Sequence, residues 1–242
     1  MNSTQNDKLV YADEWNVSSQ YFYKNEYYSW MADNLTGHKK ILEIGCGTGY
    51  STLALLEKGY DVIAVEKNEE CIRKAELLVS EGGDFDSKVV FLQGDVVEET
   101  FRNNLLEQYD FDIVICWSTG SYWNKEMMMY YLPHMIEYGL DLQQIRSNPE
   151  SSYAEMIVWY ACKLAKEKNV SVNIVDRCGE QLNEHNDSYY KCLKDEFSFA
   201  KIEYKNKEGR SLSKGGRVLT INGQASFESV MNIVFVSILL DS

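Results

Sequence analysis

The chain reads Ile41-Leu42-Glu43-Ile44-Gly45-Cys46-Gly47-Thr48-Gly49 near its start, an apolar run that passes directly into three glycines spaced two residues apart. The apolar run is typical of a buried strand, and residues 51–58 after the glycines have helical periodicity. In open α/β sheets, the turn from a strand into a helix is where backbone N–H groups and the helix N-terminus face a ligand. We therefore expect a ligand site at this turn.

Strand-like and helical stretches alternate on both sides of this turn. The sequence predicts a helix over 19–34 before it, strands at 61–66, 89–92 and 111–116 after it, a helix over 69–80, and helical sequence between the third and fourth strands. Such alternation favours an α/β fold with a doubly wound, mostly parallel, Rossmann-like sheet. With 242 residues, 45% of them apolar, we expect a single domain over 1–242.

The regular alternation of strands and helices is interrupted after the fourth strand. A stretch of 53 residues, 117–169, precedes the next strand-like run at 170–175, whereas one crossover helix needs only about a dozen residues. We expect a helical insertion over 117–169, with helices at about 124–139 and 150–168. Strand-like runs at 199–204, 216–222 and 230–240 follow, joined by glycine-containing turns, and they predict antiparallel C-terminal strands.

The composition indicates in which compartment the protein works and which classes of partner are disfavoured. The six cysteines have no CxxC spacing, so we interpret them as buried, reduced thiols and predict no metal site. The first residues carry neither a basic start nor an apolar stretch, and no apolar run is long enough to span a bilayer, which favours a cytoplasmic protein without a membrane partner. The net charge of −13 repels phosphate backbones, so nucleic acid is a disfavoured partner.

The residue after the glycine turn excludes two common nucleotide sites. A dinucleotide fingerprint, G-x-G-x-x-G/A, needs glycine or alanine at position 50, where this chain has Tyr50. A P-loop needs Gly-Lys-Ser/Thr, and Gly49-Tyr50-Ser51 lacks the lysine. A nicotinamide oxidoreductase and a nucleoside triphosphatase are therefore both disfavoured.

The pattern E-x-G-x-G-x-G after the first strand resembles the cofactor motif of class I S-adenosylmethionine-dependent methyltransferases. Glu66 ends the second strand 21 residues after Gly45, where the family's acidic residue holds the ribose hydroxyls, and Asp95 follows the third strand, where the family contacts the adenine amino group. The resemblance covers about 35–119 and implies S-adenosylmethionine as cofactor. The cofactor-binding residues that it implies here are Glu43, Gly45, Cys46, Gly47, Gly49, Glu66, Lys67, Asp95, Val96, Cys116, Trp117 and Ser118.

Aromatic residues are dense ahead of the motif, and we expect residues 1–36 to form an N-terminal helical lid. Aromatic faces attract a sulfonium and exclude water, so Tyr11, Trp15 and Tyr21 join the candidate cofactor-binding residues. Methyl transfer needs few catalytic groups, because its main requirement is alignment of the reacting atoms. The weak candidates for a catalytic residue are His134, His185 and Tyr122.

The resemblance implies a methyltransferase that acts by in-line displacement. The sequence has no Asn/Asp-Pro-Pro-Tyr/Phe after the fourth strand and no Pro-Cys pair, which leaves a small-molecule acceptor as the leading hypothesis. Two alternatives stay open: an acceptor that is a macromolecule, protein or RNA, and a non-catalytic cofactor-binding subunit. The acceptor atom and the oligomeric state are left undetermined.

Overall fold

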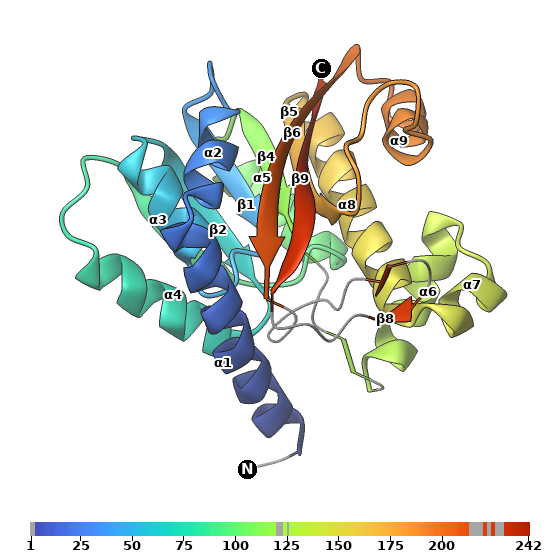
Figure 1. Cartoon of the computed structure of the whole chain (residues 1–242), viewed down its shortest axis with the longest axis horizontal. Coiled ribbons are helices and arrows are strands. Elements are labelled where there is room, and N and C mark those ends of the chain that lie inside the picture. The colour runs from blue at the N-terminus through green and yellow to red at the C-terminus, as the bar shows by residue number, and fades with distance from the viewer. Residues whose placement is uncertain (1–2, 120–122, 125, 213–219, 222–223, 226–229) are drawn as a thin grey trace.

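The structure is a computed structural model, and it describes residues 3–119, 123–124, 126–212, 220–221, 224–225 and 230–242. Helices and strands alternate through most of the chain (Figure 1). The helices are α1 (Ser3–Lys24), α2 (Tyr27–Asp33), α3 (Tyr50–Glu57), α4 (Glu69–Glu81), α5 (Glu99–Gln108), α6 (Met127–Tyr138), α7 (Leu142–Ser147), α8 (Pro149–Lys168) and α9 (Tyr189–Glu196). The strands are β1 (Lys40–Ile44), β2 (Asp61–Glu66), β3 (Val89–Gln93), β4 (Ile113–Trp117), β5 (Ser171–Cys178), β6 (Lys201–Ser211), β7 (Thr220–Ile221), β8 (Gln224–Ala225) and β9 (Met231–Asp241).

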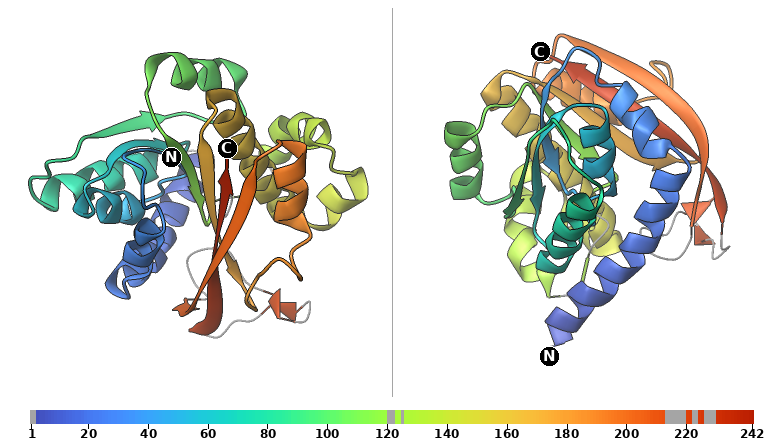
Figure 2. Two further views of the ribbon diagram at one scale, coloured as in Figure 1. Left: turned by 90° about the horizontal axis from the view of Figure 1, so that it is seen from above. Right: turned by 90° about the vertical axis from the view of Figure 1, so that its left-hand side faces the viewer.

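Seven of the strands form one sheet in the order β3-β2-β1-β4-β5-β9-β6, seen from two further sides in Figure 2. The first five strands are parallel to one another, while β9 runs antiparallel to both of its neighbours, β5 and β6. The chain order reverses between β1 and β4, which places the topological switch point beside the glycine turn. The prediction of a doubly wound, mostly parallel sheet with an antiparallel C-terminal part is confirmed.

Each face of the sheet carries its own hydrophobic core. Because side chains alternate along a strand, Ile41 and Ile115 point to one face and Leu42 and Val114 to the other. The first face is covered by α1, α2 and α3, and the second mainly by α8. Both faces of the central strands are therefore buried, and the carboxyl edge of the sheet is where a ligand can enter.

The N-terminal helix is much longer than predicted. The apolar periodicity predicts a helix only from residue 19, whereas α1 begins at Ser3. The inward face of α1 is built from Ala12, Trp15, Ser18, Ser19 and Phe22, all buried. Two of these five are serines and one is alanine, so the buried stripe carries little hydropathy signal.

The segment after β4 is also organised differently from the prediction. The helix expected at 150–168 is α8, which packs on β4 and β5 and is therefore the regular crossover between them. Among the described residues of this segment, the extra helices are α6, expected at 124–139, and α7, which was not predicted. Asp141 caps α7 by accepting hydrogen bonds from the backbone N–H groups of Gln143 and Gln144.

The C-terminal third contains a helix where only strands were predicted. The unpredicted helix α9 is held at its start by Asp187, whose carboxylate accepts from the backbone N–H groups of Tyr189 and Tyr190. Of the strand predicted at 216–222, residues 216–219 and 222 lie outside the described residues, and Thr220–Ile221 is a strand. The prediction that all cysteines are buried is wrong for Cys178, which is only partly buried, and for Cys192, which is exposed. No helix within the described part of the chain combines the length and the apolarity needed to cross a bilayer.

Candidate functional site

The glycine turn follows β1 and is hydrogen-bonded to the carboxyl end of β2. The backbone N–H groups of Gly45 and Cys46 both donate to the carbonyl oxygen of Val65, at 2.8 and 3.1 Å. Gly45 and Gly47 have φ of +76° and +54°, in the left-handed region that disfavours side chains. Other groups also approach both glycines closely, because a Cβ on Gly45 would lie 2.6 Å from Thr119 Cγ2 and one on Gly47 would lie 2.4 Å from Trp15 Nε1.

Glu43 lies behind the turn and fixes it to the following helix. Its buried carboxylate accepts hydrogen bonds from the hydroxyls of Ser51 and Thr52, the latter at 2.6 Å. Burial raises the pKa of Glu43 to about 7, although the two hydroxyl donors oppose that change. Glu43 therefore joins β1 to α3 from beneath.

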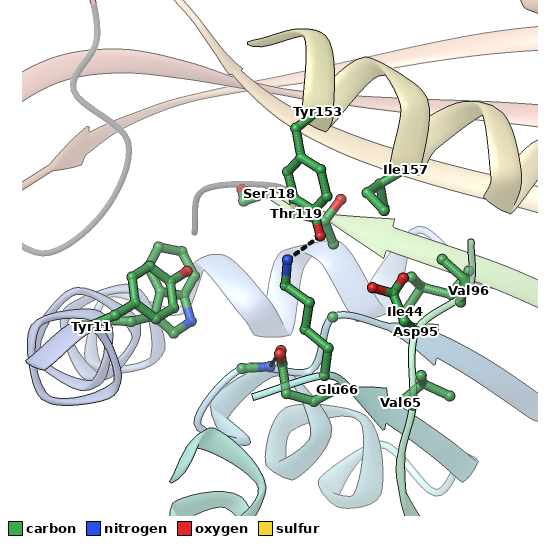
Figure 3. A pocket seen from close by; sticks show the side chains of 15 residues that line it. Tyr11, Ile44, Val65, Glu66, Asp95, Val96, Ser118, Thr119, Tyr153 and Ile157 are labelled. Carbon is green, nitrogen blue, oxygen red and sulfur yellow. Dashed lines mark hydrogen bonds between the residues drawn. The ribbon is translucent and has the colours of Figure 1, made fainter. Parts of the chain in front are cut away.

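A cavity opens above the turn, at the carboxyl ends of β1, β2 and β3 (Figure 3). Its volume is about 60 Å³ in this structure. Figure 3 shows Tyr11 entering from one side and Asp95 and Val96 on the opposite side, with Tyr153 above and Glu66 below. The lining residues are Tyr11, Trp15, Ile44, Gly45, Gly47, Val65, Glu66, Lys67, Gly94, Asp95, Val96, Ser118, Thr119, Tyr153 and Ile157.

Glu66 ends β2 on the floor of this cavity with both carboxylate oxygens turned to backbone donors. Oε2 accepts from the N–H of Gly47 at 3.1 Å, and Oε1 accepts from the N–H of Asn68 at 2.9 Å. Burial raises the pKa of Glu66, and these backbone hydrogen bonds oppose the change. The carboxylate thus spans the space between the glycine turn and the start of α4.

Lys67 and two tyrosines form a cluster beside Asp95. The Lys67 ammonium donates to the hydroxyls of Tyr153 and Tyr131, the latter at 3.4 Å, and lies 4.1 and 4.9 Å from the centroids of the same two rings. The Tyr131 hydroxyl donates in turn to Asp95. Burial lowers the pKa of Lys67 to about 8, although the charges of Asp95 and Glu66 oppose the change.

A second cavity of about 150 Å³ adjoins the first at Ser118 and Thr119, which line both. It lies at the carboxyl ends of β4 and β5, beside α8 and the start of α9. Ser118 has φ of +51°, so the chain leaves β4 through a left-handed residue at the junction of the two cavities. The remaining lining residues are Cys116, Ser151, Ala154, Glu155, Val158, Ile174, Val175, Asp176, Tyr189 and Tyr190.

The structure brings together most of the predicted cofactor-binding residues. Those on the first cavity are Tyr11, Trp15, Gly45, Gly47, Glu66, Lys67, Asp95, Val96 and Ser118. Cys116 lines the second cavity instead. Those that line neither are Glu43, Cys46, Gly49, Trp117 and Tyr21. Gly49 is the N-cap residue of α3 and packs against Ala75. The indole N–H of Trp117 donates to Asn173 at 2.8 Å, on the face of the sheet that α1, α2 and α3 cover.

The two candidates for a catalytic residue that the structure describes fall outside both cavities. His134 lies on α6 with Nδ1 at 3.3 Å from the Tyr160 hydroxyl, and His185 is exposed ahead of α9. Neither is among the described residues that line the two cavities. Tyr122 lies outside the described residues.

Sequence reasoning missed six lining residues: Ile44, Val65, Gly94, Thr119, Tyr153 and Ile157. Four of them sit next to a predicted residue, at the end of a strand or just after it, so strand ends alone could have indicated them. Tyr153 and Ile157 come from α8, and no local signal marks them. Their place is set by how α8 packs on the sheet.

The chain is similar in sequence to known methyltransferases. The family described as "Methyltransferase domain" matches residues 41–137. The YqeM protein of Bacillus subtilis (strain 168), which is named as a methyltransferase, is 29% identical over 92 residues, which are 38% of this chain and 34% of that protein. The match thus spans about a third of that relative's length.

Solved structures share the fold at low identity. The precorrin-6y C5,15-methyltransferase of Geobacter metallireducens GS-15 superposes with a TM-score of 0.52 and 10% identity, over 90% of this chain and 88% of that one. A structure described for the conversion of a disulfide bond into a thioacetal group during echinomycin biosynthesis has a TM-score of 0.51 and 12% identity, over 89% of this chain and 81% of that one. At sequence identities this low, the superpositions show that the folds are alike and nothing further.

Proposed function

We propose that the chain is a class I S-adenosylmethionine-dependent methyltransferase, an enzyme that transfers a methyl group from S-adenosylmethionine to a small-molecule acceptor. One observation carries this proposal: two adjoining cavities lie at the carboxyl edge of the sheet, and the first holds the glycine turn, Glu66 and Asp95 together. A cofactor cavity joined to an acceptor cavity is the minimum that a transferase requires.

The residues of the first cavity fit the cofactor chemically. Gly45 and Gly47 leave the backbone of the turn without side chains, so a ligand can approach the main chain. The two oxygens of Glu66 suit a vicinal diol, and the Asp95 carboxylate suits an amino group. We assign the ribose hydroxyls to Glu66 and the adenine amino group to Asp95.

The first cavity must widen before it can hold a whole cofactor. Its volume of about 60 Å³ is well below the roughly 300 Å³ at which ligand sites begin. The Lys67 side chain reaches across it to Tyr153, and rotation of this flexible side chain is the smallest change that enlarges the space. We infer that Lys67 leaves this position when the cofactor binds.

The surrounding residues position the reactants and exclude water. Tyr11 and Trp15 on α1 close one side of the first cavity, and Tyr153 on α8 closes another. The bound cofactor supplies a sulfonium-activated methyl group, which an acceptor lone pair displaces in line while the C–S electron pair leaves on sulfur. The chain contributes alignment and a dry, aromatic wall, which suffice for such a displacement.

The second cavity supports a small acceptor. It is a pocket of about 150 Å³ beside α8, which suits a small molecule or a single protruding group. The net charge of −13 argues against an RNA acceptor. A protein acceptor that inserts one side chain is the alternative that the experiment below distinguishes.

Calorimetry with S-adenosylmethionine and S-adenosylhomocysteine tests the cofactor. We expect saturable heat for both in the wild type and in Glu81→Ala, which removes an exposed carboxylate of α4 away from the cavity. Incubation of the enzyme with methyl-labelled cofactor and two fractions of a cell extract, metabolites and macromolecules, then locates the label by mass spectrometry. Absence of cofactor binding contradicts the proposed function, and label confined to proteins contradicts a small-molecule acceptor.

A further inference from the structure

Trp15 of α1 brings a hydrogen-bond donor to the wall of the first cavity. The side chain is 5% exposed, and its indole N–H donates to no acceptor within the described part of the chain. A Cβ on Gly47 would have Nε1 as its nearest neighbour, at 2.4 Å, followed by the adjacent ring atom Cδ1 at 2.8 Å. The N–H edge of the indole is therefore turned toward the glycine turn, where a ligand of the cavity can reach it.

The glycine turn itself has few free donors for an anion. The N–H groups of Gly45 and Cys46 both donate to the same carbonyl oxygen of β2, and that of Gly47 donates to the Glu66 carboxylate. The N–H of Gly49 donates back to the turn, to the carbonyl oxygen of Cys46. Turns and helix N-termini bind anions through N–H groups that point at the ligand. An anion at this turn therefore needs a donor from another element.

The proposed cofactor would place an anion at this turn. Strands β3, β2 and β1 are neighbours in that order; Asp95 follows the first, Glu66 ends the second, and the glycine turn follows the third. With adenine at Asp95 and ribose at Glu66, the amino-acid tail of the cofactor continues over β1, toward Gly47 and Trp15. Figure 3 shows Tyr11, one turn before Trp15 on α1, on the side of the cavity away from Asp95. The tail carries the cofactor's one carboxylate, which is its strongest hydrogen-bond acceptor.

Two rival sets of donors in the same cavity are placed for other roles. The Lys67 ammonium donates to the Tyr131 hydroxyl, which donates to Asp95, so the lysine is on the side that we assign to adenine. Ser118 and Thr119 also line the second cavity, at the junction where the methyl group would pass from cofactor to acceptor. This leaves the indole N–H, beside the glycine turn, as the donor best placed for the carboxylate.

We propose that the indole N–H of Trp15 donates a hydrogen bond to the carboxylate of the bound cofactor and thereby holds α1 over the site. This inference rests on the proposed function, because it names the residue that recognises the amino-acid end of the same cofactor. It differs from the expectation that the ring attracts the sulfonium, since an indole presents its electron-rich face to a cation and its N–H edge to an anion.

Two ligands that differ by one group test this inference: S-adenosylhomocysteine and its decarboxylated analogue, S-adenosyl-3-thiopropylamine. Each is titrated calorimetrically into the wild-type protein and into Trp15→Phe, which keeps an aromatic ring and removes the N–H. We expect the substitution to weaken S-adenosylhomocysteine about tenfold, because the acceptor is charged, and the analogue less than about twofold. Loss of ring packing alone would weaken both ligands equally.

Two further variants serve as comparisons. Trp30→Phe removes the same N–H group from α2, where the side chain is partly buried and is not among the described residues that line either cavity. It should leave both affinities unchanged. Lys67→Met removes the rival cationic donor and should preserve the difference between the two ligands. Circular dichroism confirms that each variant is folded.

Amide hydrogen exchange in the wild type tests the same contact without a substitution. Saturating S-adenosylhomocysteine should slow exchange across residues 8–18 of α1 several-fold, because the new hydrogen bond holds this helix on the site. The decarboxylated analogue, also at saturation, should slow it less than about twofold. This measurement does not depend on how well Trp15→Phe folds.

Different results overturn the two proposals. Equal weakening of both ligands in Trp15→Phe, equal binding of both by the wild type, or equal slowing of exchange by both would overturn the role of Trp15. A difference between the ligands that disappears in Lys67→Met and persists in Trp15→Phe would assign the carboxylate to the lysine instead. Wild-type protein that binds neither ligand would contradict the proposed function itself, and this proposal with it.

Discussion

Lys67 is a cation in a cavity that we propose binds the sulfonium of a cofactor. Its ammonium group lies among Tyr153, Tyr131 and Asp95, and burial lowers its pKa to about 8. The folded protein therefore binds the lysine proton less tightly than the unfolded chain, in which the pKa is near 10.5. By linkage, this lysine destabilises the fold below pH 8, and the penalty disappears as the pH rises from 8 to 10.5.

Replacement of Lys67 by methionine is expected to stabilise the protein at pH 7 by about 1 kcal/mol. The pKa change corresponds to roughly 3 kcal/mol against the charged form. The variant loses about 1 kcal/mol for the hydrogen bonds to the two tyrosine hydroxyls, of which the one to Tyr131 is long, and about 1 kcal/mol for the contacts with the two rings. Urea unfolding at pH 7 and pH 10 measures the difference from wild type, which should shrink or reverse at pH 10. Lys88→Met, at an exposed site, is the control. An equal gain at both pH values would show that charge is not the cause.

Glu66→Ala should weaken binding of S-adenosylhomocysteine by about 1–3 kcal/mol, because the hydrogen bonds to a diol are lost. Calorimetry measures the change, with Glu81→Ala as the control, and circular dichroism checks the fold. The Ala variant also frees the N–H of Gly47, so a small loss of stability is expected alongside. Unchanged affinity in Glu66→Ala would refute the assignment of the ribose hydroxyls.

At the residue scale, the sequence could predict those site residues whose position depends on a strand end. Glu66 and Asp95 line the cavity because strands of a parallel sheet bring their carboxyl ends to one edge. Glu43 and Gly49 belong to the same motif but lie behind the turn, and spacing alone cannot separate a residue that faces the ligand from one that supports the backbone. The cavity role of Tyr153 depends on tertiary packing that no local pattern encodes.

Among the secondary-structure elements, α1 has a dual role as a cover for the sheet and a wall of the first cavity. Phe22 packs edge-to-face on Phe235 of β9 with ring centroids 5.3 Å apart, which anchors the helix, while Trp15 rests on Gly47. The sequence could not predict the first half of α1, because small and polar residues form much of its buried stripe. Helices α7 and α9 are short, and Asp141 and Asp187 at their starts are the signals that could have revealed them.

Comparison of two glycine variants tests the contact between α1 and the turn. Gly47→Ala and Gly59→Ala both place a side chain at positive φ, which costs about 1–2 kcal/mol. A Cβ at Gly59 meets nothing within 4 Å, whereas one at Gly47 would lie 2.4 Å from the Trp15 indole. We expect Gly47→Ala to cost a further 1–3 kcal/mol or so in the free energy of unfolding. Amide hydrogen exchange across α1 should accelerate in Gly47→Ala and remain unchanged in Gly59→Ala. Equal exchange in the two variants would mean that Trp15 does not hold the helix in place.

For the molecule as a whole, acidic charge dominates, with a net value of −13. The ion pairs are mostly at exposed positions, such as Lys40 with Asp110 and Lys58 with Asp33, and exposed pairs contribute little. Repulsion among the excess carboxylates therefore outweighs attraction, and salt should screen it. We expect the melting temperature to rise between 20 and 200 mM NaCl at pH 7.5, as measured by calorimetry. A fall in melting temperature would show that attractive pairs govern the electrostatics instead.

Whole-molecule topology was the most predictable level, because alternation of short apolar runs and helices leaves few arrangements of a parallel sheet. The predicted strands at 41–44, 61–66 and 89–92 coincide closely with β1, β2 and β3. The insertion was misjudged, because α8 was counted as extra although it is the crossover itself. Length alone cannot tell a long crossover helix from an added one.

The contribution of α1 and α8 to the first cavity limits how the site could be transplanted. The family match at 41–137 contains the glycine turn, Glu66 and Asp95, but it contains neither Tyr11 and Trp15 nor Tyr153. A protein engineer who grafted only that span onto another scaffold would therefore transfer the floor of the site and leave its enclosure behind. Chimeras intended to exchange acceptor preference should exchange the first helix and the crossover helix along with it.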